Sequence, residues 1–219
     1  MSTKQEQEEI KQIIATGLDF LASVCTVASG INPLFEIAGK LLRMGSNVLK
    51  GDEMKEMENK FKAIDSNLQN VSQIVSELCS VIQEGEAKAM LSRIEGQIKR
   101  QFRALVEVVE CKKKIEHFHS ECFSTNTYKN IDDLYCSVMG EETLFGQSIL
   151  SIYKDKYKSD KNSMKELCDH LKYLFVIGII TYLEYVESKS GGDPEPREEW
   201  KAKVNKVWKR MEEAIEECN

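Results

Sequence analysis

Proline is scarce in this chain, which has Pro33, Pro194 and Pro196 as the three prolines among its 219 residues. Because proline interrupts helices, nothing between residues 34 and 193 forbids long ones. The sequence also lacks strand-like alternation and internal repeats. It therefore predicts an all-α fold, an elongated multi-helix bundle with long amphipathic antiparallel helices and a central apolar helix.

A linker in the middle of the chain is also absent, and 219 residues are enough to bury a sizeable core. We therefore expect one helical-bundle domain over residues 1–219. Its expected irregular parts are a polar amino-terminal tail at residues 1–9 and a Gly/Pro break at residues 190–196, before the last helix.

An excess of basic charge is missing, because 36 acidic residues outnumber 30 basic ones and the net charge is −6. This balance argues against a nucleic-acid partner, which needs a clustered basic footprint. The amino terminus shows no secretory signal, and the seven cysteines are odd in number and irregularly spaced. We expect reduced thiols and a cytoplasmic protein, with association with a membrane as the alternative location.

Catalytic motifs are missing as well: there is no phosphate-binding glycine loop, no G-x-S-x-G and no H-E-x-x-H. One local set resembles metal ligands, but its C-x5-H-x-H-x2-C spacing fits no common zinc site, and we interpret it as surface residues at a helix end. The set comprises Cys111, His117, His119 and Cys122. We interpret His170 as a boundary residue of the helix before the apolar run. We therefore predict no enzymatic activity, no metal and no cofactor.

Long apolar runs are few, and the most apolar one covers residues 173–183, which carry no charge. Eleven such residues are too few to span a bilayer, which needs roughly 20. The run is either the central helix of a bundle or a hydrophobic element kept in reserve. As core it should bury Leu171 and Leu174, with Gly178 allowing a neighbour to approach closely. The candidate apolar residues here are Tyr173, Phe175, Ile177, Gly178 and Ile180.

A second apolar block lies near the amino terminus, where residues 20–35 are sixteen uncharged positions rich in small residues. Gly30 and Pro33 interrupt it, so it predicts two helices, roughly 8–29 and 33–50, joined by a bend. The block is either a core hairpin or a hairpin that transfers into lipid. Its candidate residues are Phe20, Val24, Val27, Ile31, Pro33 and Phe35.

Two amphipathic stripes at helical spacing follow, one over residues 54–82 and one from Leu91 to Val109. They predict an antiparallel hairpin of long helices. Between about residues 118 and 131 we expect less regular structure, then a helix capped by Asp132 and ended by Gly140. Further helices are expected over residues 141–157 and 163–189, and in a last helix with Pro196 at its start.

Basic residues gather late in the second stripe, interleaved with Glu107, Glu110 and Glu116. They would attract an anionic membrane surface at about 1 kcal/mol per charge, but the interleaved glutamates favour an ordinary solvated helix face. This candidate basic surface comprises Lys99, Arg100, Arg103, Lys112, Lys113 and Lys114.

Several blocks of sequence occur in a specific order along most of the chain. They are FKAIDSNLQNVSQI at 61–74, LYCSVMG at 134–140, LFGQSILSIY at 144–153, MKELCDHLKYLFVIGIITYLEY at 164–185 and EEWKAKVNKVWKRMEEAIEEC at 198–218. In this order the chain resembles the rapunzel family, small fish proteins linked to fin and skeletal development. The resemblance implies a developmental role and supplies no enzymatic mechanism.

Two classes of function fit these features. In the first, the chain is a regulatory or interaction module that binds an unknown protein partner or self-associates. In the second, it is membrane-active and resembles α-helical pore-forming proteins, which keep an apolar hairpin against amphipathic helices until they meet a membrane surface.

Overall fold

The computed structural model describes residues 85–110, 115–141, 147–156, 160–190 and 195–218. These parts of the chain form six helices and no strand, which confirms the all-α fold. The helices are α4 (Gly85–Glu110), α5 (Ile115–Ser124), α6 (Thr127–Met139), α7 (Ile149–Lys156), α8 (Lys161–Ser190) and α9 (Glu195–Glu216).

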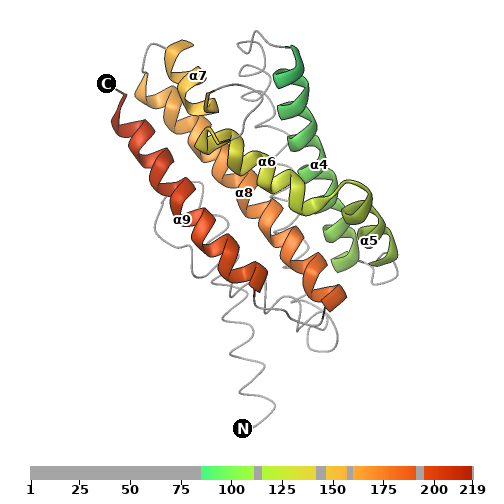
Figure 1. The fold of residues 1–219 in the computed structure, drawn as a ribbon. Coiled ribbons are helices and arrows are strands. Elements are labelled where there is room, and N and C mark those ends of the chain that lie inside the picture. Colours follow the sequence, from blue (N-terminus) through green and yellow to red (C-terminus); the bar gives the residue numbers. More distant parts are fainter. Residues whose placement is uncertain (1–84, 111–114, 142–146, 157–159, 191–194, 219) are drawn as a thin grey trace.

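Helix α8 is the centre of the bundle, as expected. It runs between α4 on one side and α9 on the other, and α9 returns along it in the opposite direction (Figure 1). Helix α6 packs across α8 and also touches α4 and α9, whereas α5 and α7 lie at opposite ends of the bundle (Figure 1). At 1.5 Å per residue, the 30 residues of α8 span about 45 Å, which makes the bundle elongated.

Apolar stripes run along α4 and α9, and the one on α4 confirms the stripe expected from Leu91 as far as Leu105. On α4, Leu91, Ile94, Ile98 and Phe102 are fully buried and Leu105 nearly so, every third or fourth residue. On α9, a single face is buried in the same way, while the opposite face is exposed at Lys206, Lys209, Glu212, Glu213 and Glu216. The buried residues of α9 include Trp200, Val204, Val207, Trp208 and Met211.

Capping explains where several helices begin and end. Asn126, in the left-handed region at φ 50°, accepts a hydrogen bond from the Lys129 amide and starts α6, and Gly140 at φ 80° ends it. The Ser148 hydroxyl accepts from the Ser151 amide at 3.1 Å, and the Asp160 carboxylate accepts from the Ser163 amide at 2.7 Å. These side chains satisfy amides that lack a partner at the start of α7 and α8.

The expectation of irregular structure at residues 118–131 is wrong. This stretch is helical apart from the turn at Thr125 and Asn126. Its Ser, Thr and Asn residues disfavour a helix, but Phe118, Cys122 and Ile131 are buried in the core at helical spacing. Tertiary packing therefore outweighs local preference here.

Two expected boundaries also need correction. Asp132 lies inside α6 and does not cap it, because the cap at Asn126 already starts the helix. Helix α7 begins at Ile149, eight residues later than expected, because the Ser148 cap sets its start. By contrast, α8 extends the expected helix by two residues at the start and one at the end, and Pro196 is the second residue of α9, as expected.

The remaining expectations fall outside the described residues. These are the tail at 1–9, the hairpin at 8–50 with its candidates Phe20, Val24, Val27, Ile31, Pro33 and Phe35, the stripe at 54–82, and Lys112, Lys113 and Lys114. Helix α8 ends at Ser190 and α9 begins at Glu195, so both helix ends fall within the break expected at residues 190–196.

Candidate functional site

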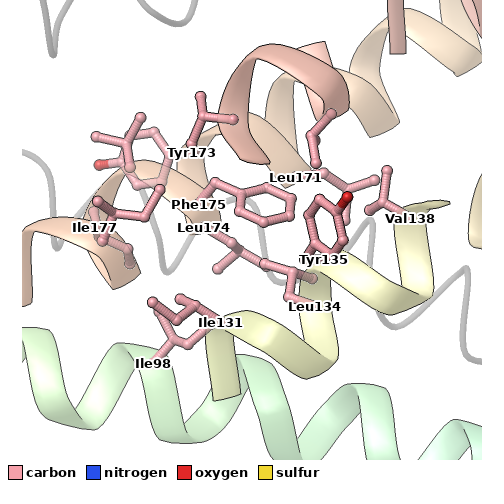
Figure 2. Close-up of a cluster of buried hydrophobic side chains, with 14 of the residues drawn as sticks. Ile98, Ile131, Leu134, Tyr135, Val138, Leu171, Tyr173, Leu174, Phe175 and Ile177 are labelled. Carbon is pink, nitrogen blue, oxygen red and sulfur yellow. The ribbon is translucent and has the colours of Figure 1, made fainter. Parts of the chain in front are cut away.

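The apolar core around α8 is where the candidate residues of the central run lie. Leu171, Leu174, Phe175, Ile177 and Ile180 are buried, which confirms their expected placement. Tyr173 is buried too. The rings of Phe175 and Trp208 meet edge to face with centroids 6.0 Å apart, which joins α8 to α9. Figure 2 shows residues from α4, α6 and α8 gathered in this cluster.

Gly178 allows α6 to approach α8 closely, as expected. A methyl group added at Gly178 would overlap the Cγ2 atom of Ile131 on α6 and lie 3.6 Å from the Cγ2 atom of Ile98 on α4. These two isoleucines lie together in Figure 2. The three helices therefore meet at a point where α8 has no side chain.

A polar cluster is enclosed between α4 and α8. Lys99 and Glu95, one turn apart on α4, form an ion pair whose side chains are 9% and 8% exposed. The Nε2 atom of His170 on α8 lies 3.8 Å from the Glu95 carboxylate, and its side chain is 0% exposed. Neither ring nitrogen of His170 has a hydrogen-bond partner among the described residues.

Burial decides the protonation of this cluster. It lowers the pKa of His170 from 6.5 to about 3, and the nearby Lys99 charge adds to the effect. Burial raises the pKa of Glu95, against the opposing effect of Lys99. The cluster therefore holds a neutral imidazole beside an ion pair at neutral pH. His170 is not the boundary residue that we expected, because its spacing from Leu167 and Leu174 places it on the core face.

A second cluster surrounds Lys203 where α6, α8 and α9 meet. Its ammonium group lies 2.6 Å from the Asp132 carboxylate and 2.9 Å from that of Glu199. It also lies over three aromatic rings, at 4.9 Å from the ring centroid of Trp200 and 5.4 Å from those of Tyr128 and Tyr135. The two carboxylates and the Tyr128 hydroxyl raise the pKa of Lys203 despite partial burial.

Sequence reasoning missed this Lys203 cluster. The signal was present in the spacing, because Tyr128, Asp132 and Tyr135 follow one another every three or four residues along one face of α6. Trp200 and Lys203 are three residues apart on α9. Only the packing of α6 against α9 shows that the two faces meet.

The thiols of the described core are protected. Burial raises the pKa of Cys122 to about 11 and that of Cys168 to about 12, so both remain protonated at neutral pH. The Sγ atom of Cys168 lies 3.8 Å from the carbonyl oxygen of Met211 on α9. These cysteines therefore behave as small core residues.

The candidate basic surface is divided by the fold. Lys99 is buried against Glu95, so its placement on a surface was wrong. Arg100 and Arg103 are exposed, and Arg100 pairs with Glu121 of α5 at 3.3 Å. At the end of α5, Phe123 is 79% exposed.

The four residues with a resemblance to metal ligands do not share one surface. His117 is exposed, Cys122 is buried, and His119 lies half-buried with its ring 6.0 Å from that of Tyr185. Cys111 lies outside the described residues. Within the described part of the chain, no three His, Cys, Asp or Glu side chains are grouped as metal ligands would be.

The helical bundle resembles a known protein family and a known protein. Residues 49–219 match the family described as the cephalotoxin-like middle helical domain, so the chain belongs to that family. It is also similar to protein rapunzel of Danio rerio, with 29% identity over 97% of this chain and 96% of that protein. The resemblance to the rapunzel family is thus confirmed over nearly the whole length. No solved structure matches the chain.

Among the residues that the structure describes, no helix has a stretch both long enough and apolar enough to span a bilayer.

Proposed function

We propose that this rapunzel-like protein is a non-enzymatic interaction module that binds a protein partner or a second copy of itself through its outer helical faces. The resemblance to protein rapunzel supports a regulatory role in fin and skeletal development. One observation carries the proposal: the reactive groups of the described core are enclosed. The His170 imidazole is 0% exposed, and the Cys122 and Cys168 thiols are buried, so a substrate has no access to them.

The part of the surface that suits a partner best is the end of α5. Phe123 is exposed there, two residues after Glu121, which forms an ion pair with Arg100 of α4. Aromatic and arginine side chains are the residues that contribute most to protein interfaces. A partner with an apolar pocket rimmed by acidic groups would match this end of the bundle.

The test is capture of neighbours by proximity labelling in fin cells, with a light-scattering measurement of mass for the purified protein. We expect defined partners, or a dimer, that are lost in the variant Phe123→Ser. The matched control is Ser120→Ala, an exposed position one turn earlier on α5. A monomer at all concentrations, together with a labelling pattern that Phe123→Ser leaves unchanged, would contradict the proposal.

A second candidate function is membrane activity through release of α8. Two observations favour it: α8 is an apolar helix enclosed by its neighbours, and the matching family is described as cephalotoxin-like. Leakage of dye from anionic liposomes tests it directly. The variant Met211→Cys is designed as the control, with the aim of tying α8 to α9 through a disulfide to Cys168, whose Sγ atom lies 3.8 Å from the Met211 carbonyl oxygen.

The two functions give different results in this assay. Membrane activity requires leakage by the unmodified chain, no leakage by oxidised Met211→Cys, and recovery after reduction. The interaction module requires no leakage by any of these proteins.

A further inference from the structure

The interface between α4 and α8 contains a polar group that has no part in the proposed interaction function. The imidazole of His170 is completely buried there, and neither nitrogen is hydrogen-bonded to a described residue. A neutral imidazole carries one N–H donor and one acceptor nitrogen. Burying either without a partner costs free energy, so the folded bundle already holds His170 at a disadvantage.

Protonation of the His170 imidazole would raise the free energy of the closed α4–α8 interface further. The charged groups that face His170 come from α4: the Glu95 carboxylate at 3.8 Å, and the Lys99 ammonium that already pairs with Glu95. Helices α6 and α9 pack on α8 through Gly178 and Phe175 and bring no charged group to the imidazole within the described residues. A protonated His170 would thus be a second buried cation competing for one carboxylate.

We propose that His170 is an acid-sensitive switch in the α4–α8 interface, and that its protonation separates α4 from α8 and exposes the apolar surface of α8. The bundle opens at the α4–α8 interface, because the positive charge of protonated His170 is buried there without a partner of its own. Helix α9 stays attached, because its contacts with α8 at Phe175 and Cys168 involve no charged group.

The direction of the pH effect follows from the two states of the histidine. In the open or unfolded chain His170 titrates near 6.5, whereas in the bundle its pKa is about 3. The closed interface is therefore fully stable above about pH 7 and loses stability as pH falls from 6.5 towards 3. Between pH 7.5 and pH 5 the opening equilibrium constant should rise by about 30-fold through His170.

Glu95 acts in the opposite direction, because its pKa is raised and the closed state takes up its proton more readily. The effect of His170 must therefore be isolated by comparing variants. Urea denaturation at pH 7.5 and pH 5 measures the unfolding equilibrium constant. The rise of about 30-fold that His170 contributes between these two pH values should be absent in His170→Leu. His170→Gln serves as a second variant that keeps a polar side chain without a titrating group.

The matched control is His117→Gln, which changes an exposed histidine on α5. It should keep the pH dependence of the unmodified protein. If both His170 variants also keep it, the switch does not exist. All of these measurements use the purified full chain without a partner, so their failure leaves the proposed interaction function untouched.

Hydrogen exchange measured by mass spectrometry at pH 7.5 and pH 5, corrected for intrinsic rates, locates the opening. We expect faster exchange in α4 and in the adjoining part of α8 at pH 5, while α9 remains protected. The acceleration should be absent in His170→Leu. Equal acceleration in all helices would show unfolding of the whole bundle and would overturn the proposed separation of α4 from α8.

Discussion

The two sides of α8 are held in different ways. Towards α9 the contacts are uncharged: Phe175 meets Trp208 edge to face, and the Cys168 thiol, which stays protonated at neutral pH, donates a hydrogen bond to the Met211 carbonyl oxygen. Towards α4 the same helix buries an ion pair and an unpaired imidazole. Apolar burial hardly depends on pH, whereas buried titratable groups link stability to pH. Helix α8 thus takes part in one contact whose stability hardly depends on pH, with α9, and in one whose stability does depend on pH, with α4.

The largest effect is expected on the α9 side. Phe175→Ala should lower the free energy of unfolding by about 3–5 kcal/mol, because it leaves a cavity against Trp208. Urea denaturation of the purified protein measures it, with Lys165→Ala on the exposed face of α8 as the control. An unchanged midpoint would place Phe175 outside the core.

On the α4 side, Lys99→Met should destabilise the protein by about 3 kcal/mol, because it leaves the Glu95 carboxylate buried without its partner. The raised pKa of Glu95 keeps this loss moderate, since the carboxyl group can take up a proton. The double variant Glu95→Leu/Lys99→Met should recover the loss or exceed the original stability. A double variant less stable than Lys99→Met would show that the ion pair stabilises the bundle.

At the point where α4, α6 and α8 meet, Gly178→Ala should cost about 1–3 kcal/mol. The added methyl group overlaps Ile131, so either α6 must shift or the isoleucine must change rotamer. Combining it with Ile131→Ala, which removes the overlapping Cγ2 atom, should cost less than the sum of the two single losses. Thermal melts of the two single variants and the double variant check this coupling. Strictly additive losses would mean that the two side chains do not compete for the same space.

The smallest effect is expected at Lys203, whose side chain is 21% exposed. Lys203→Met should cost about 1 kcal/mol, since partly hydrated ion pairs and cation–π contacts contribute little each. The loss should shrink at high salt, unlike that of Lys99→Met, because screening acts on the accessible pair. Urea denaturation with and without added sodium chloride compares the two lysines, and equal salt dependence would contradict their different burial.

Sequence reasoning succeeded where periodicity carries the signal. The stripe from Leu91 to Leu105 and the apolar helix around Phe175 are buried as expected, because helical spacing alone decides which face is apolar. Helix α5 and the first part of α6, before Asp132, were missed, because the Ser, Thr and Asn residues of this stretch have low helix propensity.

The polar contacts were harder to predict. The charged sequence around Lys99 predicts a surface residue. Only the packing of α4 on α8 shows that Lys99 is enclosed with Glu95 and His170. Likewise, the Lys203 cluster joins α6 and α9 through residues that are far apart in sequence, such as Asp132 and Lys203, which are 71 positions apart. Pairing of distant faces is a property of tertiary structure that one sequence does not reveal.

The enclosure of α8 is the central claim of this account, and native-state hydrogen exchange at pH 7.5 tests it most directly. The amides of residues 171–181, all of them buried, should exchange only when the whole bundle unfolds. The free energy obtained from their exchange should therefore equal the free energy of unfolding in urea. Exchange of these amides at a clearly lower free energy would show that α8 leaves the core without global unfolding, and would contradict the account.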